Sequence, residues 1–140
     1  MLWFGFDVRA DEISVTDGDS IWYRSGGWGP NEDQSIGAVK YRLKGYDAPE
    51  IRHRKSVSDD QAEWGRLATI QLKEAIGAAR DIWIKPVIFG RWYTVNHPVR
   101  LARLIIDGKD AAKIMISAGM AVKAKIEGGH IVRAKWDKMD

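Results

Sequence analysis

The chain has 140 residues, which suits one compact domain, and its apolar fraction of 45% is ordinary for a globular protein. A formal net charge of +3 gives only a mild preference for polyanionic partners. The absence of cysteine excludes disulfides, thiolate metal sites and a cysteine nucleophile, and the three histidines lack the spacing of zinc ligands.

The N-terminal part of the chain predicts a short apolar lead followed by a β-hairpin. MLWFGF has no basic region and no cleavage site, so we do not expect a signal peptide; the chain as it stands would be cytoplasmic, or secreted or periplasmic if a signal has been removed. EISV and SIWY flank the turn sequence DGD, which predicts a hairpin. The following stretch, residues 25–37, is rich in Gly, Pro, Asn and acidic residues and predicts a long loop.

The rest of the chain alternates between strand and helix patterns. AVKYRLKGY predicts a strand that ends before Pro49, and SVSDDQAEWGRLATIQLKEAIGAA predicts a helix with Ser58 as N-cap. DIWIKPVIF predicts a strand in which Pro86 indicates an edge or a bulge, GRWYTVNHP a loop, and VRLARLIID another strand. KDAAKIMISAG predicts a short helix, and the remainder shows no pattern beyond a short strand at residues 121–125.

This order of elements predicts a mainly β fold with α-helices. Three strands, a helix, two strands and a helix are the order of a five-stranded Greek-key barrel of the OB type with two packed helices. We expect a single domain over residues 1–140, with the barrel and helices at about residues 11–125 and a short basic tail at residues 126–140. No stretch is long enough to span a membrane, so we expect no membrane partner.

Arg42, Asp47 and Glu50 lie close together in YRLKGYDAPEIRH. Alone, an R-x4-D-x2-E spacing is most often an exposed strand end with solvated charges. With DGDS at residues 17–20 before it, and LARLIIDGKD and SAGMA after it, the series resembles the staphylococcal-nuclease-like (thermonuclease) family. The resemblance runs over about residues 15–122, and the combination of DGD-[ST] with R-x4-D-[AT]-P-E in this order is specific.

The resemblance implies a phosphodiesterase site, because members of this family hydrolyse phosphodiester bonds in DNA and RNA, usually with Ca²⁺. Such a site must neutralise the charge of the phosphodiester, supply a base and orient the attacking water. By this resemblance Asp19 and Asp47 hold the metal together with the backbone carbonyl of Ala48. Glu50 orients or deprotonates the water, and Arg42 contacts the phosphate, for which a guanidinium fork is suited.

The sequence departs from the family's pattern at a second arginine, which members of the family usually carry within a G-R-x-L-A pattern. Here Val99 occupies the expected position, Arg100 follows one residue later, and Pro98 replaces the glycine. A shift by one residue turns a strand side chain to the opposite face. Either a bulge near Pro98 returns Arg100, our candidate, to the site, or Arg100 points elsewhere and the site lacks one charge. Arg91 and Arg103 are alternatives.

The expected protein is thus a monomeric Ca²⁺-dependent nuclease. It would act on single-stranded or loosened DNA and RNA with little sequence specificity, with the 5′ oxygen leaving to give 3′-phosphate ends. The alternatives are a catalytically weak or inactive nucleic-acid-binding module of the same fold and a protein-interaction module. Among the aromatic residues, Trp28 and Trp92 fall in predicted loops, where they either stack on bases or pack the loop, whereas Trp22, Trp64 and Trp83 are expected in the core.

Overall fold

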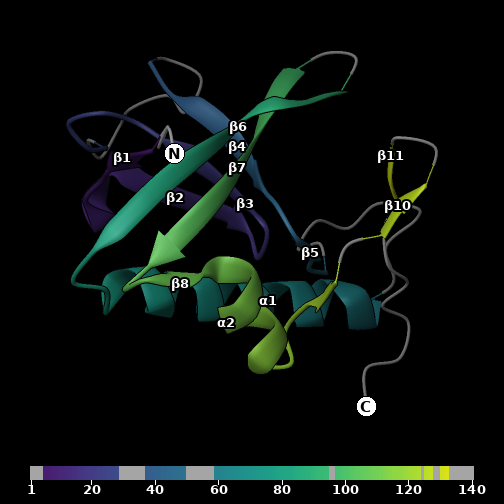
Figure 1. Ribbon diagram of the computed structural model, residues 1–140. Helices are drawn as coiled ribbons and strands as arrows, with labels where there is room; N and C mark the ends of the chain where they lie inside the picture. The colour runs from purple at the N-terminus through teal and green to yellow at the C-terminus, as the bar shows by residue number, and fades with distance from the viewer. Residues whose placement is uncertain are drawn as a thin grey trace.

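The computed structural model describes residues 5–28, 37–49, 59–94, 97–123, 125–127 and 130–132. These residues form a mainly β structure in which a curled sheet lies over two helices (Figure 1). The predicted mainly β class with two helices is therefore confirmed. The helices are α1 (Asp59–Gly77) and α2 (Ala111–Ser117). The strands of the sheet are β1 (Phe6–Asp7), β2 (Ile13–Asp17), β3 (Ser20–Tyr23), β4 (Val39–Leu43), β6 (Ile82–Thr94), β7 (His97–Ile106) and β8 (Lys109–Asp110).

The strands are hydrogen-bonded in the order β1-β6-β7-β4-β3-β2, and β8 pairs with β7. The predicted hairpin is confirmed, because β2 and β3 pair in antiparallel fashion around the turn at Gly18 and Asp19. β4 pairs in parallel with β7, so the last long strand returns beside the third strand of the β2–β3–β4 meander.

A tight turn redirects the chain after β4. Gly45 has φ +100°, a conformation that L side chains rarely adopt, and the chain then enters the short strand β5 (Tyr46–Asp47). β5 leaves the main sheet and pairs with β9 (Val122–Lys123). This turn carries Asp47 back towards the β2–β3 hairpin.

The core lies between the inner face of the sheet and the helices. The helix α1 contributes Ala68, Leu72 and Ile76, spaced four residues apart, while Leu67 is exposed. The helix α2 contributes Ala111 and Met115. The buried sheet residues are mainly branched aliphatics, among them Ile21, Leu43, Ile82, Ile84, Leu104 and Ile106.

The sequence interpretation was wrong at one loop and at the end of one strand, and it was incomplete in the tail. AVKYRLKGY, predicted as one strand, ends at Leu43, because a turn at Lys44 and Gly45 separates it from β5. Residues 90–94 and 97–98, predicted as a loop, are the ends of β6 and β7, with Trp92 opposite Val99 and Tyr93 opposite Pro98. Aromatic and β-branched residues favour strands, and this outweighs the neighbouring Gly and Pro. The tail adds β10 (Lys125–Glu127) and β11 (His130–Val132), which pair with each other.

Pro86 marks an irregularity, as predicted: the β6–β7 register shifts between Pro86 and Arg91. The proposed N-cap Ser58 lies outside the described residues, as do residues 29–36 of the predicted long loop. Neither helix of the described chain is both long and apolar enough to cross a membrane.

Candidate functional site

Three segments distant in sequence bring Asp19, Arg42 and Asp47 together. Asp19 lies in the β2–β3 turn, Arg42 on β4, and Asp47 in β5. The Arg42 guanidinium bridges the two carboxylates: Nη1 contacts Asp19 Oδ2, and Nη2 donates to Asp47 Oδ1 at 3.1 Å. We call these three residues the buried ion cluster.

The carboxylate of Asp19 is also held by its neighbours in space. The backbone N–H of Ala48 donates to Asp19 Oδ2 at 2.9 Å, and the hydroxyl of Ser20 donates to Asp19 Oδ1 at 3.2 Å. The backbone carbonyl of Tyr46 accepts from Arg42 Nη2 at 3.1 Å. The predicted site residues Asp19, Arg42, Asp47 and Ala48 therefore belong to one hydrogen-bonded unit.

Gly18 is required where the hairpin meets the helix. A Cβ atom at this position would lie 2.8 Å from the Cβ of Ala68 on α1 and 2.9 Å from the Cβ of Ala48. The Tyr46 hydroxyl donates to the Gly18 carbonyl at 2.6 Å. The glycine of DGDS thus lets the turn pack tightly against α1, and this packing fixes the neighbouring Asp19.

The cluster is almost completely shielded from solvent. The exposed fractions of Asp19, Arg42 and Asp47 are 0%, 2% and 1%. Burial lowers the pKa of the Arg42 guanidinium, but the charges and hydrogen bonds of Asp19 and Asp47 outweigh it and raise that pKa above its ordinary value. Burial and the charge of Asp19 raise the pKa of Tyr46 well above its ordinary value, so its hydroxyl remains a donor.

The donor atoms of the cluster fit a hard divalent cation in chemical type and in charge. Ca²⁺ takes carboxylate and carbonyl oxygens, and two carboxylates with one guanidinium leave an excess of one negative charge. Within the described part of the chain, no third Asp, Glu or His joins these carboxylates to form a metal-binding group. Glu50, the predicted residue for the water, lies outside the described residues.

Arg100 is not brought to the cluster. It pairs with Tyr41 across β4 and β7, whereas Arg42 pairs with Leu101, so Arg100 and Arg42 point to opposite faces of the sheet. Arg100 is exposed and lies near the Tyr41 hydroxyl: burial raises the pKa of Tyr41, and the charge of Arg100 partly offsets this. Val99, at the position where the resemblance led us to expect the second arginine, is buried.

A bulge near Pro98 does not reverse this orientation. β6 and β7 pair regularly from Thr94 opposite His97 to Arg91 opposite Arg100. The register shift lies beyond these pairs, between Arg91 and Pro86 of β6. Of the two alternatives, Arg103 donates to Asp110 Oδ2 at 2.8 Å on the surface, and the side chain of Arg91 lies outside the described residues.

Sequence reasoning missed the supporting residues Ser20 and Tyr46. Ser20 is part of the DGDS motif, so a hydroxyl next to Asp19 was visible as a candidate partner. No local signal shows that Tyr46 reaches back to Gly18, because that contact depends on the turn at Gly45.

Searches of protein-family models and of curated proteins found no match to this chain.

Proposed function

We propose that this chain is a Ca²⁺-dependent phosphodiesterase of the thermonuclease type. It would cleave single-stranded or loosened DNA and RNA with little sequence specificity and leave 3′-phosphate ends. The observation that carries the proposal is the convergence of Asp19, Arg42 and Asp47, from three separate segments, into one buried cluster with an excess negative charge. A cluster of this composition has the ligands for a hard cation and a guanidinium for a phosphate.

We also propose that β2, β3, β4, β6 and β7 form the OB-type barrel. Support comes from the curl of the sheet and from the parallel pairing of β4 with β7. That pairing gives the strand order β2-β3-β4-β7-β6, in which the last two strands are exchanged relative to the sequence, as a Greek-key connection requires. The site would then lie where the first hairpin and the chain leaving β4 meet.

In the proposed mechanism, Asp19, Asp47 and the Ala48 carbonyl would hold the cation, which when bound would supply charge neutralisation at the phosphate. Glu50 orients or deprotonates the attacking water. Both amino groups of Arg42 now contact carboxylates, so it must exchange a carboxylate for a phosphate oxygen to stabilise the developing charge. Arg42 is therefore expected to act only when substrate and cation are both present.

The test is cleavage of labelled single-stranded DNA by the parent and by Glu50→Gln, each with Ca²⁺ and with chelator. We expect cleavage by the parent with Ca²⁺ only, and a loss of at least about a hundredfold in Glu50→Gln because the water loses its base. Glu63→Gln is the matched control, since Glu63 is exposed on α1 and pairs with Arg66. Equal cleavage by the parent and Glu50→Gln would contradict the proposed role.

The second candidate is a nucleic-acid-binding module without catalysis. Two observations favour it: Arg42 is 2% exposed with both amino groups engaged, and Arg100 lies on the opposite face. In the same assay this candidate predicts binding of the DNA without cleavage under either condition. Absence of binding even at low salt, where phosphate contacts are strongest, would instead indicate a protein-interaction module.

A further inference from the structure

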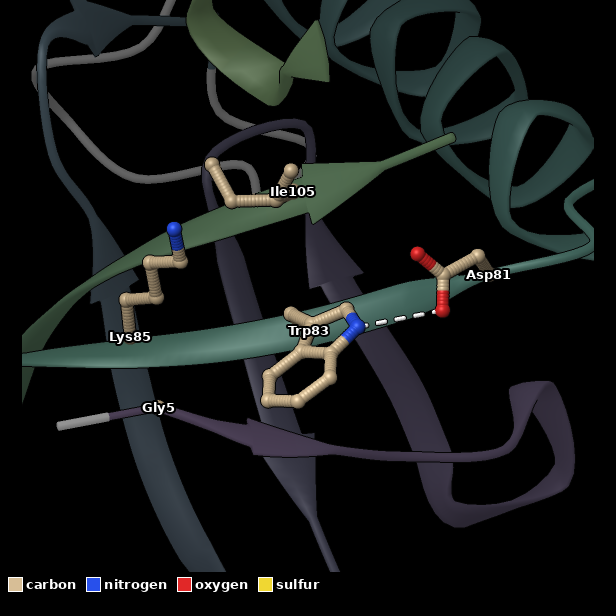
Figure 2. Close-up of a pocket in the computed structure, with 5 residues that line it drawn as sticks. All are labelled: Gly5, Asp81, Trp83, Lys85 and Ile105. Carbon is tan, nitrogen blue, oxygen red and sulfur yellow. Dashed lines mark hydrogen bonds between the residues drawn. The ribbon is translucent and has the colours of Figure 1, made fainter. Parts of the chain in front are cut away.

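Away from the buried ion cluster, a pocket opens on the outward face of the sheet beside β1, β6 and β7 (Figure 2). Its volume is about 370 Å³, and it is lined by Gly5, Asp81, Trp83, Lys85 and Ile105. Volumes of roughly 300–1,000 Å³ are typical of ligand sites. The lining is mainly apolar, with a carboxylate at one end and an ammonium at the other, as Figure 2 shows.

Trp83 forms an aromatic wall of this pocket instead of filling the core. It pairs with Ile105 across β6 and β7, while the alternating residues Ile84 and Leu104 face inward and are fully buried. The indole N–H donates to Asp81 Oδ1 at 3.0 Å, which satisfies its only donor and fixes the orientation of the ring. The ring is half-buried and thus provides a fixed aromatic surface.

A cross-strand pair of positively charged residues lies near Trp83 on the same face of the sheet. Lys85 pairs directly with Arg103 on the same face as Trp83, and like charges in opposed positions repel each other. Arg103 is partly neutralised by Asp110 at 2.8 Å. Lys85 and Arg103 thus place two cationic groups side by side at this end of the pocket, to which a phosphate is complementary.

Gly5 keeps space beside these two side chains. A Cβ atom at position 5 would lie 2.9 Å from Cγ of Lys85 and 3.6 Å from Cε3 of Trp83. Any larger residue would therefore displace the lysine stem and crowd the indole edge. A variant at this position blocks the pocket without removing an aromatic ring or a charge.

We propose that this pocket is a subsite for single-stranded nucleic acid, in which one base stacks on Trp83 and a phosphate of the same strand lies beside Lys85. Stacking on an aromatic ring next to a cation is how proteins bind single strands without reading sequence. Leu101, next to Arg42, and Ile105, next to Trp83, lie on the same face of β7. They are separated by about 13 Å at about 3.3 Å per residue, so a strand of a few nucleotides spans both sites.

The proposal rests on the proposed function for its class of ligand, and its test measures binding without cleavage. The dissociation constant of a fluorescent single-stranded oligonucleotide is measured by anisotropy in chelator for the parent, Trp83→Ala and Lys85→Ala. We expect Trp83→Ala to weaken binding about tenfold, because stacking of one base is lost. Lys85→Ala should weaken binding and lower the salt dependence by about one phosphate contact.

Two controls separate the subsite from general charge and from misfolding. Lys73→Ala removes an exposed lysine of α1 and should change binding far less than Lys85→Ala. Gly5→Val fills the pocket while Trp83 and Lys85 stay, and it should weaken binding severalfold even if Trp83→Ala does not fold. An abasic oligonucleotide should bind the parent and Trp83→Ala equally, because it has no base to stack.

The outcomes distinguish this proposal from the proposed function. Unchanged affinity in Gly5→Val, or in folded Trp83→Ala, overturns the subsite, even where the parent cleaves DNA with Ca²⁺. Binding that depends on Trp83 in a parent that never cleaves supports the subsite and contradicts the nuclease. The proposal is also overturned if Trp83→Ala weakens binding of the abasic strand by the same factor as binding of the intact strand. Trp83 would then have a role other than base stacking.

Discussion

At the scale of single residues, Arg42 determines whether the cluster is stable. It is the guanidinium that both buried carboxylates contact, and removing one partner of a buried ion pair leaves an uncompensated charge in the interior. The same contacts that preserve the cluster also occupy the group proposed to bind phosphate. Stability and activity are therefore expected to respond together when Arg42 is changed.

Replacing Arg42 by methionine should lower the free energy of unfolding by about 3–5 kcal/mol, because Asp19 and Asp47 then lose their shared cation inside the protein. Urea denaturation gives the value. The matched control is Arg103→Met, since the Arg103–Asp110 pair is partly exposed and such pairs contribute about 0–1 kcal/mol. Equal losses in the two variants would show that Arg42 does not hold the cluster together.

Glu12 should make the fold sensitive to acid. Its two carboxylate oxygens accept from the backbone N–H groups of Arg9 and Gly26, both at 2.8 Å, and these bonds lower the pKa of Glu12 below its ordinary value. A lowered folded-state pKa gives stability that is present above the unfolded pKa of about 4.3 and is lost as the pH falls towards the folded value. In Glu12→Gln, stability measured by urea should fall less steeply than in the parent between about pH 5 and pH 3; parallel curves would refute this role.

The site residues differ in how far the sequence could predict them. Asp19, Arg42, Asp47 and Ala48 were identified from motif order, and the structure brings them together. The bridging of both carboxylates by Arg42 was not predicted, because it depends on the turn after β4 and on the register of β3 and β4. For Arg100 the sequence left two orientations open, and the structure has the one in which a one-residue shift reverses the face, so our candidate Arg100 does not reach the cluster.

At the scale of elements, the site depends on the contact between α1 and the β2–β3 hairpin. Elements with a clear period or a turn signal were predictable: the DGD hairpin, the first part of the strand before Pro49, which is β4, and the helix α1. The ends of β6 and β7 were not predictable, because the neighbouring Gly and Pro indicated a loop there. The strands β10 and β11 were not predictable either, because they have too few residues to show a period. Tertiary pairing determines such segments.

Gly18→Ala should test that contact. The new methyl group would lie 2.8 Å from the Cβ of Ala68 and 2.9 Å from the Cβ of Ala48, so the hairpin or the helix must move, at a cost of about 1–3 kcal/mol in unfolding free energy. Gly77→Ala is the control: within the described part of the chain, nothing beyond its chain neighbours and the nearby helix backbone lies within 4 Å of its Cβ position, and alanine favours helices. A stability loss in Gly77→Ala as large as that in Gly18→Ala, measured by thermal denaturation, would contradict the packing argument.

At the scale of the whole molecule, one sheet face connects the buried ion cluster with the Trp83 pocket. Arg42 lies beside Leu101 at one end, and Trp83 beside Ile105 at the other. The formal charge of +3 adds a weak general attraction for polyanions, so local contacts must supply most of the affinity. We therefore expect the protein to bind a single strand along this face and to cleave it at the cluster.

If this cluster holds calcium for phosphodiester cleavage, as we propose, the cleavage rate must depend on calcium. The rate on single-stranded DNA is measured against Ca²⁺ concentration for the parent and for Asp47→Asn, with folding of both verified by circular dichroism. We predict saturable calcium-dependent cleavage by the parent and, in Asp47→Asn, a half-saturating calcium concentration higher by at least about tenfold, because one ligand charge is lost. The same calcium curve in both proteins, or no cleavage by the parent at any calcium concentration, would contradict the claim.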